Sequence, residues 1–196
     1  MSFTNTVKNE ILNSRLKKDC CRYAEAYAYL LFFNLKTRSN VKLKFNTEAD
    51  AAYYRSLFKK AFNTQSEIEE TDAKFYLRFP LTPEDILISL INCKIDRQIF
   101  KCENCTTAFI RGTFLSCGKV SDPQKEYHAE FVFKNEQLAY DFLQILKIVF
   151  PLSRLTERKG KFIIYIKDAD SIENLIAIIG APNASMEVMQ TAIFKD

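Results

Sequence analysis

The stretch Thr107–Val120 reads TAFIRGTFLSCGKV and predicts a helix with one glycine, Gly112, in its middle and another, Gly118, at its end. A glycine inside a helix costs about 1 kcal/mol relative to alanine, so a close contact must offset that cost. Ala108 lies four residues before Gly112 on the same helical face, and small residues on one face let two helix backbones approach closely. We therefore predict that this helix packs against a second helix along a seam of small side chains.

An internal repeat supplies the second helix. The segment Cys21–Asn34, CRYAEAYAYLLFFN, aligns with Cys105–Gly118, CTTAFIRGTFLSCG, without a gap. A repeat of this length predicts two pseudo-symmetric halves, residues 1–93 and 94–196, rather than a solenoid. The alternative, that Gly112 contacts another part of the core, stays open. The small residues that we expect to pair the two helices are Ala24, Ala28, Ala108 and Gly112.

The order of the predicted elements is the same in both halves: helix, hairpin, helix, hairpin, helix. We predict an α+β fold of two αββαββα halves with the two repeated helices paired at the centre. The pattern includes two extended runs between Lys36 and Phe45, a short helix over Pro83–Asn92 and a hairpin that turns at Lys159-Gly160. Each central helix then delivers its C-terminal end to the same edge of the molecule.

The composition is that of a globular protein with its own core, since 47% of the 196 residues are hydrophobic and 27% are charged. The net charge of +4 suits an anionic partner but does not single one out. No apolar run approaches the roughly 20 residues that cross a bilayer, and Met1–Asn13 lacks the apolar centre of a signal peptide. We therefore expect a cytoplasmic protein without a membrane partner, whose six cysteines are reduced thiols.

Paired helices of small residues that each open an αββαββα unit resemble the LAGLIDADG homing endonucleases. The resemblance implies that the hairpins form a β-saddle over duplex DNA. It also implies that an acidic residue before the glycine at the end of each central helix holds a divalent metal for phosphodiester hydrolysis. Phe33 and Cys117 occupy these acidic positions, and neither is a carboxylate. The expectation is therefore a nuclease scaffold that is not an enzyme, with no catalytic residues, no metal and no cofactor.

A second resemblance, to the WhiA family of bacterial regulators, extends over essentially the whole chain. It rests most firmly on AFIRGTFLSCGKVSDPQKEYHAEF, Ala108–Phe131, where Arg-Gly, Gly-x-Val-x-Asp-Pro and Tyr-His-x-Glu occur in one stretch. The chain departs from the family at Cys117, where a small residue is usual, and at Asn104-Cys105, where two cysteines are usual. The other matching positions are Ser2-Phe3-Thr4, Val7-Lys8, Glu10, Cys20-Cys21, Ala24-Glu25, Arg158-Lys159 and Ile179–Ala184.

Membership of this family would imply a DNA-binding regulator of transcription and cell division, and in some lineages of sporulation, that associates with the nucleoid. The LAGLIDADG-like region would then be a docking scaffold for DNA or protein. Family members continue into a C-terminal helix-turn-helix that reads sequence. We expect these residues to lack it, because they stop at Ile193–Asp196.

The predicted hairpins carry lysines and arginines. VKLKF alternates apolar and basic residues, which places Lys42 and Lys44 on one face of a strand. On a saddle such residues would contact phosphates without reading sequence, so we expect double-stranded DNA as the partner. A solvated sheet face is the alternative, because Glu126, Glu130 and Glu157 lie among them. The candidate DNA-binding residues are Lys36, Arg38, Lys42, Lys44, Lys119, Lys125, Arg154, Arg158, Lys159 and Lys161.

Two other functions stay open at this point. One is a protein-interaction module without DNA contact, with partners in transcription or division, and the other is an active metal-dependent DNA endonuclease with displaced ligands. His128 is the only histidine and lies in a strand pattern with acidic neighbours, so we expect a structural role for it rather than general acid or base catalysis. Neither GxxxxGK[ST] nor GxGxxG is present, so nucleotide binding has no support.

Four of the six cysteines form two close pairs in the sequence. Cys102-x-x-Cys105 and Cys20-Cys21 together offer four thiolates, which is a ligand set for structural zinc. A single C-x-x-C is a weak signal, however, and buried free cysteine at the start of a helix is ordinary. The sequence alone therefore favours reduced core thiols over a metal site.

Overall fold

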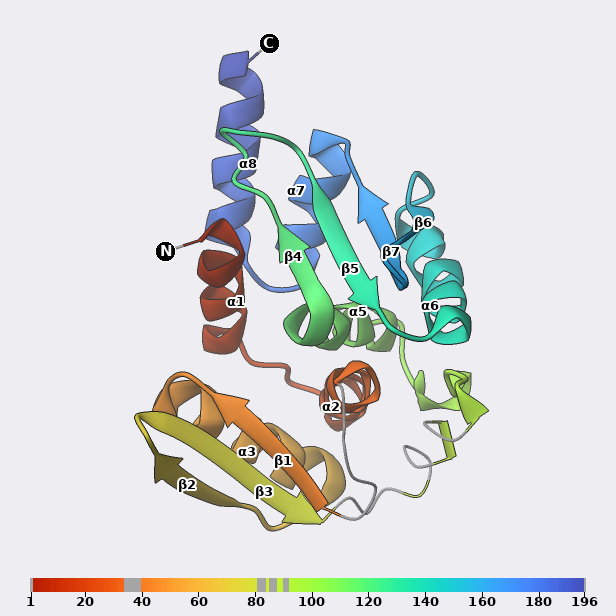
Figure 1. Ribbon diagram of the computed structural model, residues 1–196. Coiled ribbons are helices and arrows are strands. Elements are labelled where there is room, and N and C mark those ends of the chain that lie inside the picture. Colours follow the sequence, from red (N-terminus) through yellow and green to blue (C-terminus); the bar gives the residue numbers. More distant parts are fainter. Residues whose placement is uncertain (1, 34–39, 81–83, 85–87, 90–91, 196) are drawn as a thin grey trace.

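The computed structural model describes residues 2–33, 40–80, 84, 88–89 and 92–195, and Figure 1 shows the arrangement of their helices and strands. The helices are α1 (Phe3–Asn13), α2 (Asp19–Phe32), α3 (Glu48–Phe62), α5 (Cys105–Cys117), α6 (Glu136–Val149), α7 (Ala169–Ile178) and α8 (Pro182–Lys195), with a short 3-10 helix, η1 (Arg97–Ile99). The strands are β1 (Asn40–Phe45), β2 (Glu67–Thr71), β3 (Lys74–Pro80), β4 (Gly118–Val120), β5 (Ala129–Phe133), β6 (Arg154–Arg158) and β7 (Lys161–Ile166).

The strands of the described residues form two antiparallel sheets, with the orders β1-β3-β2 and β4-β5-β7-β6. The place of β1, β3 and β2 in the first sheet matches that of β5, β7 and β6 in the second. One face of each sheet is apolar and buried, as shown by Leu43 opposite Leu77 and by Phe131 opposite Ile164. Because side chains alternate along a strand, the residues between these turn to the opposite face, which we call the outer face of each sheet.

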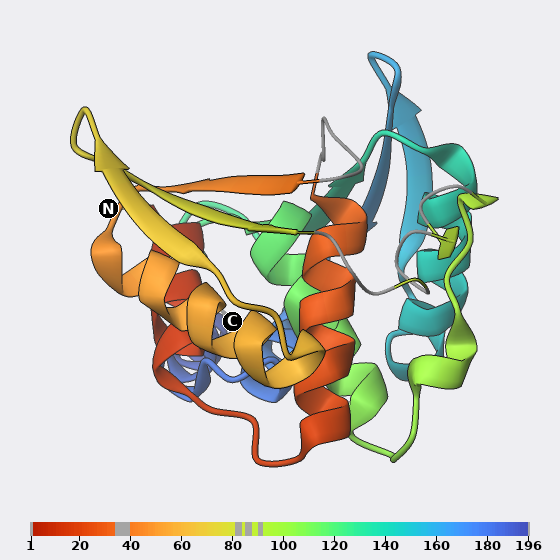
Figure 2. The same ribbon diagram turned by 90° about the horizontal axis from the view of Figure 1, so that it is seen from below.

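Helices α2 and α5 pack side by side at the centre of the molecule (Figure 2). A Cβ atom on Gly112 would fall on the carbonyl oxygen of Glu25 and lie 3.0 Å from the Cβ of Ala28. The two backbones therefore touch at this point, and position 112 of α5 has no room for a side chain. Ala24 and Ala108 are buried in the same core. The predicted pairing of the central helices is confirmed.

Local sequence signals explain where several helices and turns lie. The turn between β6 and β7 has φ of 52° at Lys159 and 66° at Gly160, and both values lie in the left-handed region that tight hairpins require. Helices α1, α3, α6 and α7 begin after a polar side chain that accepts a backbone N–H at 2.8 to 3.3 Å. These N-terminal caps are Ser2, Thr47, Asn135 and Asp168.

Some predicted elements fall outside the described residues. These are the first extended run, before β1, and most of the helix expected over Pro83–Asn92. The division of the chain into residues 1–93 and 94–196 stays a proposal. Within the described ranges, no helix combines the length and the apolar character that a membrane span requires.

Candidate nucleic-acid interface

The outer face of the first sheet carries Lys42 and Lys44 on β1, where both side chains are exposed and alternate with buried apolar residues. The strand register places Lys42 opposite Arg78 and Lys44 opposite Tyr76 on β3. The ammonium nitrogen of Lys42 lies 4.2 Å from the centre of the Tyr76 ring, a favourable cation–π distance. Arg78 was absent from the sequence-based candidates, although the alternation in KFYLRF places it on this face.

Acidic side chains partly neutralise that face. Glu69 on β2 forms an ion pair with Arg78 at 2.9 Å, and both side chains are about half exposed. Glu67, two residues earlier on β2, lies opposite Arg78 in the register. Lys42 and Lys44 have no such ion-pair partner among the salt bridges of the described residues, so their charges remain available to an anion.

The outer face of the second sheet carries a row of residues that crosses all its strands. The register aligns Lys119 with Glu130, Glu130 with Tyr165, and Tyr165 with Arg154. Glu130 lies 3.9 Å from the Lys119 ammonium and 3.3 Å from Nε2 of His128. His128 also stacks on Tyr165 with ring centres 6.0 Å apart. Both contacts hold the ring of His128 against other residues of this sheet.

The remaining basic candidates occupy loops and strand ends. Arg158 and Lys161 flank the β6–β7 turn that contains Lys159, and all three are exposed. Lys125 is exposed in the loop between β4 and β5, beyond the strands that form the outer face. Lys36 and Arg38 lie outside the described residues. The structure thus brings Lys42 and Lys44 together, and aligns Lys119 with Arg154 across the second sheet, but sets Lys125 apart.

The C-terminal ends of the central helices carry no carboxylate at the positions singled out by the sequence. Phe33 ends α2 and Cys117 is the last residue of α5. Lys8 approaches the end of α5 and donates a hydrogen bond to the Leu115 carbonyl at 3.1 Å. Burial lowers the pKa of Lys8 to about 8, while Cys117 opposes that shift. Burial raises the pKa of Cys117 to about 12. The end of α5 therefore presents an amine and a thiol.

A buried ion pair, which sequence reasoning missed, crosses the seam between α2 and α5. Nε of Arg111 lies 3.1 Å from Oε1 of Glu25, and both side chains are almost wholly buried, at 3% and 1% exposure. Tyr53 donates its hydroxyl to the same carboxylate oxygen at 2.7 Å. Burial raises the pKa of Glu25, and Arg111 and Tyr53 act against that rise. The sequence signal was Arg111, the one charged residue of α5, together with Glu25 among the small and aromatic residues in the middle of α2.

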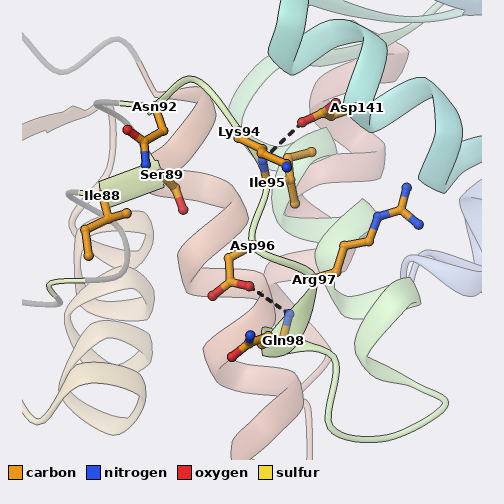
Figure 3. Close-up of a pocket in the computed structure, with 9 residues that line it drawn as sticks. All are labelled: Ile88, Ser89, Asn92, Lys94, Ile95, Asp96, Arg97, Gln98 and Asp141. Carbon is orange, nitrogen blue, oxygen red and sulfur yellow. Dashed lines mark hydrogen bonds between the residues drawn. The ribbon is translucent and has the colours of Figure 1, made fainter.

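A cavity of about 600 Å³ lies along residues 92–98, which lead into η1, and Asp141 of α6 also lines it (Figure 3). Its carboxylates are already committed to the backbone: Asp141 accepts the N–H of Ile95 at 3.3 Å, and Asp96 accepts that of Gln98 at 2.9 Å. None of the sequence-based candidate residues lines it. Two of the carboxylates that line the cavity therefore hold the backbone of residues 95–98 in place.

Four cysteine side chains meet at the N-terminal ends of α2 and α5. Cys20 and Cys21 lie in the first turn of α2, Cys105 begins α5, and Cys102 lies just before it. Within the described ranges, this is the one group of three or more potential metal ligands whose donor atoms come together. Burial acts to raise the pKa of Cys102, but hydrogen bonds from the other three thiols and from the Asn104 backbone lower it to about 7.

Comparison with known proteins agrees with this geometry. Residues 106–196 match the family described as the WhiA LAGLIDADG-like domain. A probable cell division protein WhiA from Clostridium botulinum (strain Hall) is 30% identical over 221 residues, and the match covers 100% of this chain and 70% of the relative. The chain belongs to the WhiA family. A probable cell division protein WhiA from Caldicellulosiruptor saccharolyticus is 26% identical, with coverage of 100% of this chain and 68% of that relative.

Solved structures show the same fold. Full-length DUF199/WhiA from Thermatoga maritima matches this WhiA-family chain with a TM-score of 0.79 at 19% identity, over 100% of this chain and 68% of the other. The N-terminal LAGLIDADG domain of DUF199/WhiA gives a TM-score of 0.70 at 20% identity, with coverage of 91% and 92%. I-DmoI in complex with DNA and Mn gives 0.57 at 15% identity, with coverage of 83% and 98%. The predicted α+β LAGLIDADG-like fold is confirmed.

Proposed function

We propose that this WhiA-family chain is a non-catalytic scaffold that docks duplex DNA on the outer faces of its two sheets. The observation that carries the proposal is the placement of exposed lysine and arginine side chains on both faces, with Lys42 and Lys44 free of ion-pair partners among the described salt bridges. I-DmoI, which has a similar fold and was solved in complex with DNA and Mn, supports DNA as the partner. Lysines on such a face bind phosphates and position the duplex without reading its bases.

In this proposal, sequence readout belongs to the helix-turn-helix that the WhiA resemblance implies for the family. The chain would then contribute to regulation of transcription, cell division or sporulation by positioning DNA, and it would associate with the nucleoid. Its relatives are named as probable cell division proteins. The residues proposed to contact DNA include Lys42, Lys44, Arg78, Lys119 and Arg154.

The DNA-binding proposal predicts a specific effect of charge. Wild-type affinity for a duplex of about 30 base pairs should fall steeply between about 50 and 200 mM salt, as for any protein that neutralises phosphates. The double variant Lys42→Glu/Lys44→Glu should bind at least about tenfold more weakly at low salt and show a salt slope smaller by about two. Fluorescence anisotropy over a salt series measures both quantities.

The matched control is Lys59→Glu/Lys60→Glu, which makes the same change in net charge at exposed lysines in the last turn of α3. This variant should keep most of the wild-type affinity, because α3 lies behind the first sheet rather than on its outer face. Equal losses in the two variants would show that only net charge matters. That result would contradict a specific interface on β1.

The absence of catalysis is proposed because Phe33 and Cys117 stand where the endonuclease resemblance requires acids, and Mg²⁺ requires oxygen ligands. No group of three acidic residues in the described ranges gathers to hold a metal. Supercoiled plasmid incubated with the protein and Mg²⁺ or Mn²⁺ should therefore remain uncut, with active endonuclease as the positive control. Nicking that EDTA abolishes would show instead that displaced ligands support hydrolysis.

One observation favours a second function, docking of a protein. Ile148 and Leu152 lie at and beyond the end of α6 with 72% and 64% of their surfaces exposed, and exposed apolar residues are common in protein interfaces. Absence of any mobility shift by wild-type protein at about 50 mM salt would favour this function over DNA docking. A duplex bound at low salt and released at high salt would favour DNA.

A further inference from the structure

Four cysteines that lie far apart in the sequence come together at one end of the central helix pair. The sulfur of Cys102 lies 3.6 Å from that of Cys20, 3.6 Å from that of Cys21 and 3.5 Å from that of Cys105. All four sulfurs lie within 4.8 Å of one another. Four thiolates around one zinc ion, each at about 2.3 Å, would stand about 3.8 Å apart. The cluster therefore has the dimensions of a tetrahedral four-sulfur site.

We propose that Cys20, Cys21, Cys102 and Cys105 bind one structural zinc ion that joins the two halves of the molecule. Without a metal, little beyond ordinary packing holds the four sulfurs together, because neutral thiols form only weak hydrogen bonds and neighbouring thiolates repel one another. A disulfide would need sulfurs about 2.05 Å apart, whereas the shortest separation that involves Cys102 is 3.5 Å. A single zinc ion is compatible with every one of these distances.

The local structure fits thiolate ligands. Cys102-x-x-Cys105 has the spacing of a zinc knuckle, whereas the adjacent pair Cys20-Cys21 is an unusual second half. Cys20 and Cys21 lie in the first turn of α2, and Cys105 begins α5. The partial positive charge at both helix N-termini stabilises the negative charge that four thiolates bring. With all four ligands supplied by the protein, no position is left for a substrate, so the site is structural.

The metal also has a route in. Cys21 and Cys105 are buried, but Cys20 and Cys102 are only partly buried. Cys20 lines a cavity of about 480 Å³ together with Tyr23 and Lys101, so one side of the cluster faces open space. A small chelator should reach the ion through this cavity. We favour zinc over an iron–sulfur cluster because several irons would hold their thiolates farther apart than a single ion does.

The site has a clear mechanical consequence. It links residues 81 positions apart and ties α2 to α5 at their N-terminal ends, whereas the two sheets lie at the C-terminal ends of these helices (Figure 2). A zinc ion would fix the angle between the two helices on the N-terminal side of the contact that Gly112 makes with α2. That angle in turn sets the distance between the two sheets. The inference stands independently of DNA binding.

The test is the metal content of the full chain purified without added metal or chelator. Inductively coupled plasma mass spectrometry and native mass spectrometry should give about one zinc per chain. Replacing zinc with Co²⁺ should give the intense visible absorption of a tetrahedral thiolate site. Cys102→Ser and Cys20→Ser should each lower bound zinc at least tenfold, and Cys93→Ser, which lies outside the cluster, should leave it unchanged.

Measurements on the wild-type chain keep the test decisive if a serine variant fails to fold. Titration with a strong zinc chelator should remove the ion and lower the melting temperature by several degrees, and added Zn²⁺ should restore it. The proposal is overturned by six free thiols in a chain that takes up neither Zn²⁺ nor Co²⁺. A disulfide mapped within the cluster, iron in place of zinc, or zinc retained in Cys102→Ser would also overturn it.

Discussion

Replacing Arg111 with methionine should lower the free energy of unfolding by about 3–5 kcal/mol, because the change leaves a buried carboxylate without its cation. The guanidinium donates to Glu25 at 3.1 Å and to the Ile11 and Ser14 carbonyls at 2.9 and 2.7 Å. It also donates to the Tyr53 hydroxyl at 2.9 Å. One side chain on α5 thereby joins the end of α1, the middle of α2 and α3. Urea denaturation followed by circular dichroism measures the loss.

Two further variants separate the ion pair from a general effect of losing an arginine. Arg55→Met removes an exposed arginine from α3 and should change stability by less than about 0.5 kcal/mol. The double variant Arg111→Met/Glu25→Leu should recover part of the loss, because replacing both partners of a buried pair with apolar groups costs far less than removing one. A loss below about 1 kcal/mol for Arg111→Met alone would show that the network contributes little.

Gly112→Ala should destabilise the protein by about 3 kcal/mol, against the ordinary gain of about 1 kcal/mol when alanine replaces glycine in a helix. The added methyl group would overlap the carbonyl oxygen of Glu25 and lie 2.9 Å from its carbonyl carbon. These are backbone atoms of α2 that no side-chain rotation can move, so the two helices must separate. Because the helices position the sheets, we also expect weaker DNA binding. Thermal and urea unfolding measure the effect on stability.

The control for this variant is Gly160→Ala. Gly160 has φ of 66°, so alanine there is strained, but a new Cβ atom meets nothing within 4 Å. That change should cost only about 1–2 kcal/mol, the usual penalty for a left-handed residue with a side chain. If Gly112→Ala proved as stable as the wild type, the conclusion that the backbones of α2 and α5 touch at Gly112 would be wrong.

Patterns between near neighbours predicted much of the fold. The small residues at four-residue spacing predicted the central pair of helices, and the left-handed turn at Lys159-Gly160 followed from the turn chemistry of glycine. Alternation along VKLKF predicted the exposed face of β1. Each of these signals works through contacts within a few residues or through one repeated motif. The WhiA resemblance rested on the same kind of local pattern and was confirmed by a relative 30% identical over the whole chain.

The candidate interface was only partly predictable. Arg78 joins Lys42 through the pairing of β1 with β3, and Glu69 reaches Arg78 through the pairing of β2 with β3. Residues on separate strands become neighbours only when the register is known, and a shift of one residue would place them on opposite faces. Lys125 was grouped with the hairpin residues from the sequence, whereas the structure places it in a loop beyond the strands.

The sequence by itself determined the α+β class, the paired helices, the positions of the turns and the lack of carboxylates at Phe33 and Cys117, because each depends on local pattern or on residue identity. Only the tertiary structure decided which charged and sulfur-bearing side chains meet. Arg111 lies 86 positions from Glu25, and Cys102 lies 81 from Cys21. Such pairs follow from how two helices cross, and the free energy of that crossing comes from the packing of the whole core rather than from any short stretch of sequence.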